Sequence, residues 1–257
     1  HNLTGTINIL EYCRKWQAGF FLISTSRVYS INILADLKVK IENHAYTPVE
    51  EDELAEGFTK RGVSEKFSTA APVSLYGSTK LASEVLALEY GFTFNFPVWI
   101  NRCGVLAGAG QFGTPQQGIF AFWINGYARK HPLKYIGFDG CGYQVRDALH
   151  PEDLTRLLIK QMDSPVDQHS VFNVGGGVEN SMSLAQLSAW CENKFGYHEV
   201  EEAGNSRKFD IPWIVMDCAK VSERFGWKPQ VSMGMILDEI ALHCQNNPNW
   251  LDISGVR

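Results

Sequence analysis

Tyr76 and Lys80 are two side chains whose types and spacing can do proton-transfer chemistry. They lie four residues apart in Ser74-Leu-Tyr-Gly-Ser-Thr-Lys80, which opens a helical run. On a helix this spacing puts both side chains on one face, about one turn apart. A neighbouring ammonium favours the phenolate, so the phenol can act as a base or acid. Taken alone, the spacing fits a catalytic dyad and a chance surface pair equally well.

Strands and helices that alternate along the chain must position this pair. Residues 19–26 form an unbroken apolar run that ends in hydroxyls, which is typical of a parallel strand buried on both faces. Ligands of open α/β sheets bind at the carboxyl ends of strands, where Thr25 and Ser26 are expected. Segments 96–100 and 171–174 are predicted to be further buried strands. The alternation predicts a parallel sheet, and the segmented second half predicts a smaller lobe.

Other segments carry less specific signals. Residues 27–72 are long, polar and charge-rich, and we expect an irregular excursion over a cleft whose acidic cluster, 48–53, is a solvated loop. Segments 133–138 and 144–149 are predicted to be two short strands joined by a turn. The aromatic-rich helix expected over 117–129 fits core or subunit-interface packing.

The bulk composition excludes several classes of function. A net charge of −5 over 257 residues argues against a nucleic-acid surface, and no apolar run approaches the roughly 18 residues of a membrane span. Six scattered cysteines without a Cys-x-x-Cys pair fit reduced thiols in a cytoplasmic protein, with neither a disulfide framework nor a metal site. The chain begins at His1, inside an expected helix, so we expect upstream sequence to be missing.

Five motifs in order along the chain resemble those of the extended short-chain dehydrogenase/reductase family, the NAD-dependent nucleotide-sugar epimerases and dehydratases. They are Ile23-Ser-Thr-Ser-Arg-Val-Tyr29, Tyr76-Gly-Ser-Thr-Lys80, Gln144-Val-Arg-Asp-Ala-Leu-His150, Phe172-Asn-Val-Gly175 and Arg207-Lys-Phe-Asp210. The resemblance implies an α/β fold, a Rossmann-type doubly wound parallel sheet whose N-terminal part, with its glycine loop, is missing. Residues 1–112 would be a partial NAD-binding domain. Residues 113–257 would be mainly a substrate-binding lobe, with 143–175 partly returning to the sheet.

The resemblance also implies a role for individual residues. Thr25, Tyr76 and Lys80 would be catalytic and would contact NAD, and Arg102 would bind the cofactor as well. Tyr76 would take the proton of a sugar hydroxyl, Lys80 would lower its pKa and hold the nicotinamide ribose, and Thr25 would orient the hydroxyl.

Substrate-binding candidates are implied in the second half of the chain. They are Gln117, Tyr135, Phe138, Gln144, Arg146, Arg207 and Asp210. The two arginines suit pyrophosphate oxygens, although a lone arginine is more often a surface or salt-bridge residue. Tyr135 and Phe138 fit core packing as well as a base pocket, and Gln144 fits an edge-strand polar residue. Asp210 fits a partner of Arg207 or an acceptor for a ribose hydroxyl.

Within the family, the chain most resembles the CDP-paratose 2-epimerase branch. Gln144 directly before Val145-Arg-Asp147, the tract 175–183 and Gln117-Gly118 carry that likeness. Ser26 and Arg27 stand where the family's 4,6-dehydratases have Asp-Glu, which argues against dehydratase chemistry. We therefore expect C2 epimerisation of a CDP-deoxyhexose through a transient keto sugar.

Alternatives and partners remain open. A 4-epimerase or another oxidoreductase of the family, or a non-catalytic dinucleotide-binding protein, also fits these motifs. The expected partners are a nucleotide sugar and a second copy of the chain, with no nucleic acid and no membrane. The homodimer would form through the helix expected over residues 3–16 and the helix that carries Tyr76.

Overall fold

The structure is a computed structural model that describes residues 1–49, 55–115, 117–164, 170–203 and 210–254. The α-helices are α1 Asn2–Trp16, α2 Ile31–Ala35, α3 Ser74–Phe94, α4 Ile119–Arg129, α5 Pro151–Met162, α6 Leu184–Phe195, α7 Ala219–Phe225 and α8 Met233–Asn246. The strands are β1 Phe20–Thr25, β2 Val39–Glu42, β3 Ala45–Pro48, β4 Phe58–Thr59, β5 Gly62–Val63, β6 Val98–Cys103, β7 Val105–Leu106, β8 Leu133–Ile136, β9 Val145–Leu149, β10 Ser170–Val174, β11 Ser181–Ser183, β12 Val200–Ala203 and β13 Trp213–Ile214. Short 3-10 helices are η1 Ser26–Val28, η2 Phe138–Gly140, η3 Val178–Asn180 and η4 Trp250–Ser254.

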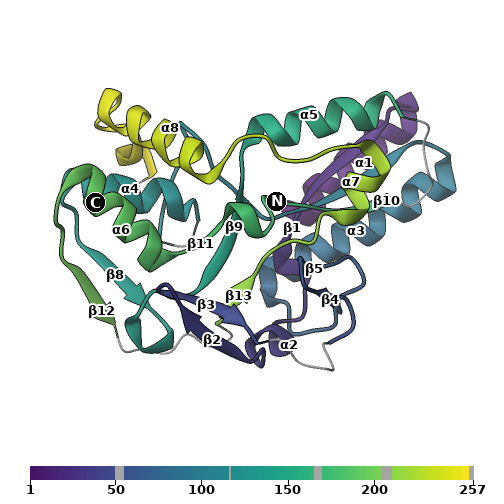
Figure 1. Cartoon of the computed structure of the whole chain (residues 1–257). Helices are drawn as coiled ribbons and strands as arrows, with labels where there is room; N and C mark the ends of the chain where they lie inside the picture. The colour runs from purple at the N-terminus through teal and green to yellow at the C-terminus, as the bar shows by residue number, and fades with distance from the viewer. Residues whose placement is uncertain (50–54, 116, 165–169, 204–209, 255–257) are drawn as a thin grey trace.

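A parallel sheet in the order β1-β6-β10 forms the centre of the first half of the chain (Figure 1). All six residues of β6 are buried, because helices cover the sheet on both faces. Leu10 of α1 and Ala87 of α3 pack with Leu22 and Ile100 on one face. Residues of α5 and α7 pack on the other face, around Trp99. This two-sided cover confirms the predicted doubly wound α/β class.

A second group of elements forms the smaller lobe. β9 lies between β11 and β13 and also pairs with β7, while β8 pairs with β12. Helices α4, α6 and α8 share one hydrophobic cluster, which lies on the opposite side of Figure 1 from α1 and α3. Phe120, Trp123 and Tyr127 of α4 are buried there, so the aromatic helix serves core packing. The division of the chain at residue 113 stays a prediction.

The expectation that residues 27–72 are irregular was wrong. β2 and β3 form an antiparallel hairpin, and β4 and β5 form a second one. Asn43 and His44 have φ values of 49° and 60°, which two-residue hairpin turns require and asparagine tolerates. The alternation of apolar and polar residues over 39–42 was the missed signal. The acidic cluster lies mostly outside the described residues.

The two strands expected on either side of residues 139–142 exist but do not pair with each other. β8 pairs in parallel with β12, and β9 joins the other sheet. η2 therefore connects two sheets and does not close a hairpin. Pairing partners that come 50 or more residues later leave no local trace in the sequence, which is why the spacing suggested a simple turn.

The cysteines, possible metal ligands and long helices can be compared with the expectations from composition. All six cysteines are free thiols. Within the described ranges, no cluster of three or more His, Cys, Asp or Glu side chains is arranged to hold a metal ion. None of the helices in the described part of the chain is both long enough and apolar enough to cross a membrane.

Candidate active site

The candidate active site begins at the carboxyl end of β1. Thr25 is the last residue of the strand and is half-buried. Its hydroxyl oxygen accepts a hydrogen bond from the backbone N–H of Arg27 (3.2 Å), which caps η1. The capping bond fixes the turn that leaves the strand, so the Thr25 side chain is held at the sheet edge where ligands of this fold class bind.

The start of α3 lies directly against that turn. Ser74, at a φ of 65°, accepts a hydrogen bond from the N–H of Gly77 with its hydroxyl (3.1 Å). A methyl group added to Gly77 would overlap the carbonyl oxygen of Arg27. The absence of a side chain at Gly77 therefore allows the first turn of α3 to touch the backbone of η1.

Lys80 anchors the next turn of the helix. Its ammonium donates a hydrogen bond to the carbonyl oxygen of Ile23 (2.8 Å). Contacts to Ile23 and Arg27 bracket Thr25, so the helix face that carries Tyr76 and Lys80 lies along the end of β1. Burial lowers the pKa of Lys80, and Cys103 and Glu84 oppose that shift.

Tyr76 is 42% exposed, so its phenol is accessible from solvent although its helix is packed. The structure thus brings the three predicted catalytic residues, Thr25, Tyr76 and Lys80, to one edge of the sheet. A solvent-accessible phenol beside a cation and a hydroxyl has the composition of a proton shuttle. Their catalytic roles stay predictions.

Arg102, the fourth predicted cofactor residue, lies in the sheet interior. It is 7% exposed and forms an ion pair with Glu84, with 2.7 Å between Nη2 and Oε2. It also donates to the hydroxyl of Tyr29 (3.4 Å). Cofactor binding by Arg102 stays a prediction. The sequence interpretation missed Glu84, although a charged residue one turn after Lys80 on a helix face that packs against a sheet was the available signal.

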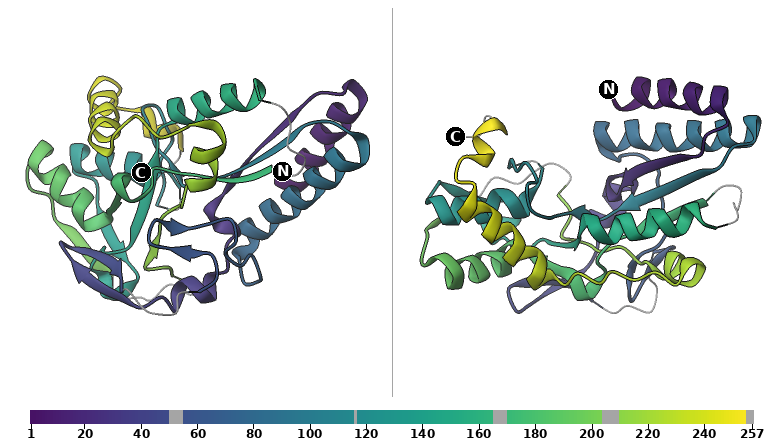
Figure 2. Two further views of the ribbon diagram at one scale, coloured as in Figure 1. Left: turned by 45° about the vertical axis from the view of Figure 1, so that its right-hand side comes forward. Right: turned by 90° about the horizontal axis from the view of Figure 1, so that it is seen from above.

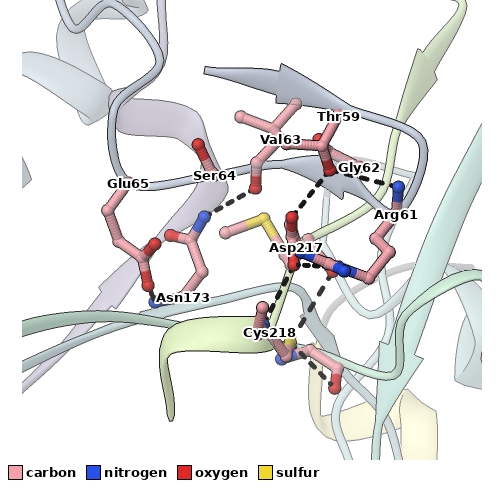
Figure 3. A network of polar contacts seen from close by, with 12 residues as sticks. Thr59, Arg61, Gly62, Val63, Ser64, Glu65, Asn173, Asp217 and Cys218 are labelled. Atoms are coloured by element: carbon pink, nitrogen blue, oxygen red, sulfur yellow. Dashed lines mark hydrogen bonds and ion pairs between the residues drawn. The ribbon is translucent and has the colours of Figure 1, made fainter. Parts of the chain in front are cut away.

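Asn173 connects β10 to the loop that precedes α3 (Figure 3). Its N–H donates to Oε1 of Glu65 (2.7 Å), and its side-chain amide donates to the carbonyl oxygen of Val63 (2.7 Å). Its amide oxygen accepts from the Tyr29 hydroxyl (2.5 Å). These contacts tie the carboxyl-terminal half of β10 to β5, to Glu65 and to Tyr29.

Asp217 forms the other half of the network in Figure 3. Its carboxylate accepts from the Thr59 hydroxyl (2.7 Å), from Nε of Arg61 (3.1 Å) and from the N–H of Ala219 (2.9 Å). The β4–β5 hairpin is thereby fastened to the start of α7. The sequence also suggested Asp217 as the cap of the helix that ends at Phe225, but the N-cap of α7 is Cys218, which makes no side-chain capping bond.

Three of the predicted substrate residues form one polar cluster in the second lobe. The Gln144 amide donates to the Ile136 carbonyl (3.1 Å) and to Oδ2 of Asp210 (3.3 Å). The Arg146 guanidinium donates to the Ile211 carbonyl (2.9 Å), next to Asp210. Desolvation, together with the positive charge of Arg27, lowers the pKa of Arg146 to about 10. The carboxylates of Asp210 and Asp147 oppose that lowering. Arg207 lies outside the described residues.

The remaining candidates have other surroundings. Tyr135 stacks on Trp123 with ring centroids 5.4 Å apart, and its hydroxyl donates to Ser188 (2.5 Å). Burial raises the pKa of Tyr135 to about 12. Phe138 packs edge-to-face against Tyr46 (5.2 Å), and Gln117 is exposed before α4. Tyr135 therefore has the contacts of a core residue, and the substrate roles of all three stay predictions.

A cavity of about 490 Å³ lies elsewhere, on the side of β9 that carries Val145. The β2–β3 hairpin, residues 58–60 and Trp213 contribute to its lining. Of the site residues predicted from the sequence, none that the structure describes lines this cavity. Part of segment 27–72 thus lines a cavity, as expected. This cavity is separate from the site that the sequence motifs predict at the end of β1.

Asp147 is a buried acid beside the Arg146 cluster. It is 2% exposed, and its Oδ2 accepts from the N–H of Gly177 (3.2 Å). A methyl group on Gly104 or Gly175 would overlap its carboxylate, so glycines form its enclosure. Burial raises the pKa of Asp147 to about 7, against the lowering effect of backbone hydrogen bonds from Gly177 and its neighbours.

We expect this acid to make stability fall as pH rises. An unfolded aspartate has a pKa of about 3.9, so between about pH 4 and pH 7 the folded chain keeps a proton that the unfolded chain has lost. Relative to an Asp147→Asn variant, the wild type should lose up to about 4 kcal/mol of unfolding free energy across that window. Denaturant titrations of both proteins from pH 4.5 to 8 measure the difference. Two parallel stability curves would contradict the prediction.

The residues at the end of β1 fit the nicotinamide half of a dinucleotide. Within the described residues, the Lys80 ammonium donates only to the Ile23 carbonyl, and an ammonium has three donors. Donors therefore remain for ribose hydroxyls, next to an accessible phenol.

Comparisons with known proteins extend this picture. A family model described as the NAD dependent epimerase/dehydratase family matches residues 1–175. The chain is 28% identical over 243 residues to the CDP-paratose 2-epimerase of Salmonella typhi, covering 90% of this chain and 67% of that protein. It is 27% identical over 235 residues to the UDP-glucuronate 4-epimerase of Thermodesulfobacterium geofontis, covering 90% of this chain and 61% of that protein.

A solved structure shows the same fold. The UDP-glucuronic acid 4-epimerase from Bacillus cereus, in complex with UDP-glucuronic acid and NAD, superposes with a TM-score of 0.70 at 24% identity. The match covers 96% of this chain and 68% of that one. The chain therefore spans 61–68% of the length of these three proteins.

Proposed function

Because the chain belongs to the NAD dependent epimerase/dehydratase family, we propose that it is part of an epimerase that inverts C2 of a CDP-linked deoxyhexose. The observation that carries the proposal is the bracketing of Thr25 by α3. Lys80 contacts the backbone before Thr25, and Gly77 contacts the backbone after it. Both contacts hold the first turns of α3, which carry Tyr76, against the end of β1.

The roles of the chain's own residues follow from their chemistry. NAD⁺, when bound, supplies a reversible acceptor for the hydride of a sugar carbon. Tyr76 takes the proton of the sugar hydroxyl and later returns it, Thr25 orients that hydroxyl, and Lys80 stabilises the phenolate by its charge. The keto sugar turns over between the two steps, so no second acid or base is needed. Ser26 and Arg27, which follow Thr25, supply no carboxylate for elimination of water.

The second lobe supports a nucleotide diphosphate as the part of the substrate that is bound and stays attached to the sugar. Arg27 and Arg146 lie close enough for one charge to lower the pKa of the other, and pyrophosphate oxygens would relieve that repulsion. Asp210 and Gln144 present an acceptor and a donor next to them, which suits ribose or base edges. Twenty-eight percent identity to a CDP-paratose 2-epimerase favours cytosine as the base and C2 as the carbon.

We further propose a homodimer. Ile9, Tyr12 and Trp16 of α1 are 52–62% exposed, and Val85 and Phe92 of α3 are 55% and 65% exposed. The two helices lie side by side, as Figure 2 shows, and each exposes apolar side chains that a second copy could cover.

Incubation of the full-length protein with CDP-paratose in deuterated buffer tests the function. We expect NMR to show inversion at C2 with no solvent deuterium at that carbon, because the same hydride leaves and returns. UDP-glucuronate, run in parallel, tests the second candidate, a 4-epimerase, which the 27% identical relative favours. Inversion at C4 of that sugar, with CDP-paratose unchanged, would replace the C2 assignment. An unchanged sugar in both incubations, with NAD bound, would refute epimerisation of either substrate.

A further inference from the structure

One row of polar side chains crosses the buried sheet beneath the candidate active site. Ser24 of β1, Arg102 of β6 and Asn173 of β10 are paired in register. Register partners in a parallel sheet project to the same face. All three are at most 7% exposed, in a layer that is otherwise apolar.

Glu84 of α3 meets this row from the helix side. It is 2% exposed, its carboxylate accepts a short hydrogen bond from the Ser24 hydroxyl, and it receives Nε and Nη2 of Arg102 at 2.7–3.2 Å. A charge so deeply buried is costly unless it is paired and hydrogen-bonded. Glu84 therefore links α3 to both β1 and β6, and these hydrogen bonds fix the position of its carboxylate.

Lys80 lies one helical turn from Glu84 on the same face of α3. Its ammonium reaches Ile23, which directly precedes Ser24, the residue that binds Glu84. Two charged side chains of one helix face thus contact two consecutive residues of β1, just before Thr25. These two contacts fix the position of α3 along the axis of β1.

The charged and titratable groups that face Lys80 are few. Glu84 lies on its own helix, and Cys103 faces it from β6. Tyr76 is one turn away on the same helix. Burial raises the pKa of Cys103 to about 12, so its thiol is neutral at physiological pH. Glu84 is consequently the anion that opposes the desolvation of the Lys80 ammonium.

We propose that Glu84, paired with Arg102, is a positioning residue that holds Lys80 against β1 and keeps its ammonium charged. The proposal rests on the proposed function, because it gives Lys80 a catalytic task. It also assigns Arg102 a task other than contact with the cofactor: the guanidinium neutralises Glu84 and lets the carboxylate be buried. Glu84 acts through Lys80 and touches neither cofactor nor substrate itself.

The test is the reactivity of Lys80 towards acetic anhydride, measured by mass spectrometry from pH 7 to 11 in the full-length protein. In Glu84→Gln the Lys80 pKa should fall by about one unit, so acetylation near neutral pH should be about tenfold faster. A merely structural role predicts the opposite sign. Loosened packing would relieve desolvation and raise the pKa towards its ordinary value. An unchanged or raised Lys80 pKa in Glu84→Gln would therefore overturn the proposal.

Matched variants keep the result interpretable. Glu89→Gln removes an exposed carboxylate from the same helix and should leave Lys80 reactivity unchanged. If Glu84→Gln does not fold because Arg102 is left unpaired, the double variant Glu84→Gln/Arg102→Met removes both charges. The Lys80 pKa should still fall in it, by less, and a rise would overturn the proposal. Since labelling needs neither cofactor nor sugar, its outcome is independent of whether the protein proves to be an epimerase.

Discussion

Replacing Tyr76 by phenylalanine is expected to lower turnover of the nucleotide sugar by about 10²–10⁴-fold, the usual contribution of a positioned proton-transfer group. The ring keeps its place on α3, and only the hydroxyl is lost. Because Tyr76 is 42% exposed and its hydroxyl makes no hydrogen bond within the described residues, the unfolding free energy should change by less than about 0.5 kcal/mol. Steady-state turnover and denaturant titration of both proteins measure the two quantities.

The control for Tyr76→Phe is Tyr197→Phe, which removes a hydroxyl from a tyrosine that is 74% exposed after α6. Its turnover should equal that of the wild type. Cofactor binding should persist in both variants, because neither ring is removed. A Tyr76→Phe protein that turns over substrate as fast as the wild type would mean that the phenol carries no proton. If neither protein turned over any sugar, a non-catalytic dinucleotide-binding protein would be favoured.

Gly77→Ala is expected to damage both stability and activity. The added methyl would overlap the Arg27 carbonyl oxygen, and a backbone atom cannot rotate away as a side chain can. The first turn of α3 must therefore move off η1, at a cost of about 1–3 kcal/mol of unfolding free energy. Tyr76 moves with that turn while Thr25 stays on β1. A displacement of about 1 Å between catalytic groups can cost roughly 10²-fold in rate.

Gly234→Ala is the matched control, since Gly234 is also helical but nothing lies within 4 Å of the added methyl. That variant should gain up to about 1 kcal/mol of stability, the usual preference of a helix for alanine over glycine. The two substitutions are chemically identical and should shift the denaturation midpoint in opposite directions. A midpoint that rises in Gly77→Ala would show that η1 yields to the methyl at no cost.

Local patterns in the sequence predicted the parts of the fold that depend on local physics. The apolar run that ends at Thr25 is a strand because helices cover both faces of its sheet. His150, which ends the third motif, caps α5 because its ring accepts from the N–H of Glu152 two residues later. The spacing of Tyr76 and Lys80 became a shared helix face for the same local reason.

Long-range pairing could not be predicted in this way. Nothing near Glu84 in the sequence indicates that Ser24 and Arg102 are its partners, because strand register decides which residues share a row. The hairpin of β2 and β3 was missed because its strands are short and partly exposed. The many charged residues of the segment indicated a loop more strongly than the alternation of apolar and polar residues indicated a strand. Tyr135 shows the same limit, since its stacking on Trp123 depends on how α4 meets β8.

The buried row also sets an order of assembly. The Tyr29 hydroxyl finds its acceptor 144 residues later, at Asn173, and Glu65 finds the N–H of Asn173 after 108 residues. Forming a contact between residues so far apart in the sequence costs loop-closure entropy before the contact stabilises the chain, which slows folding. On the ribosome, which adds about 5–20 residues per second, the layer beneath Tyr76 and Lys80 cannot close until β10 has emerged. The polar row beneath the candidate site therefore cannot be complete before Asn173 has been made.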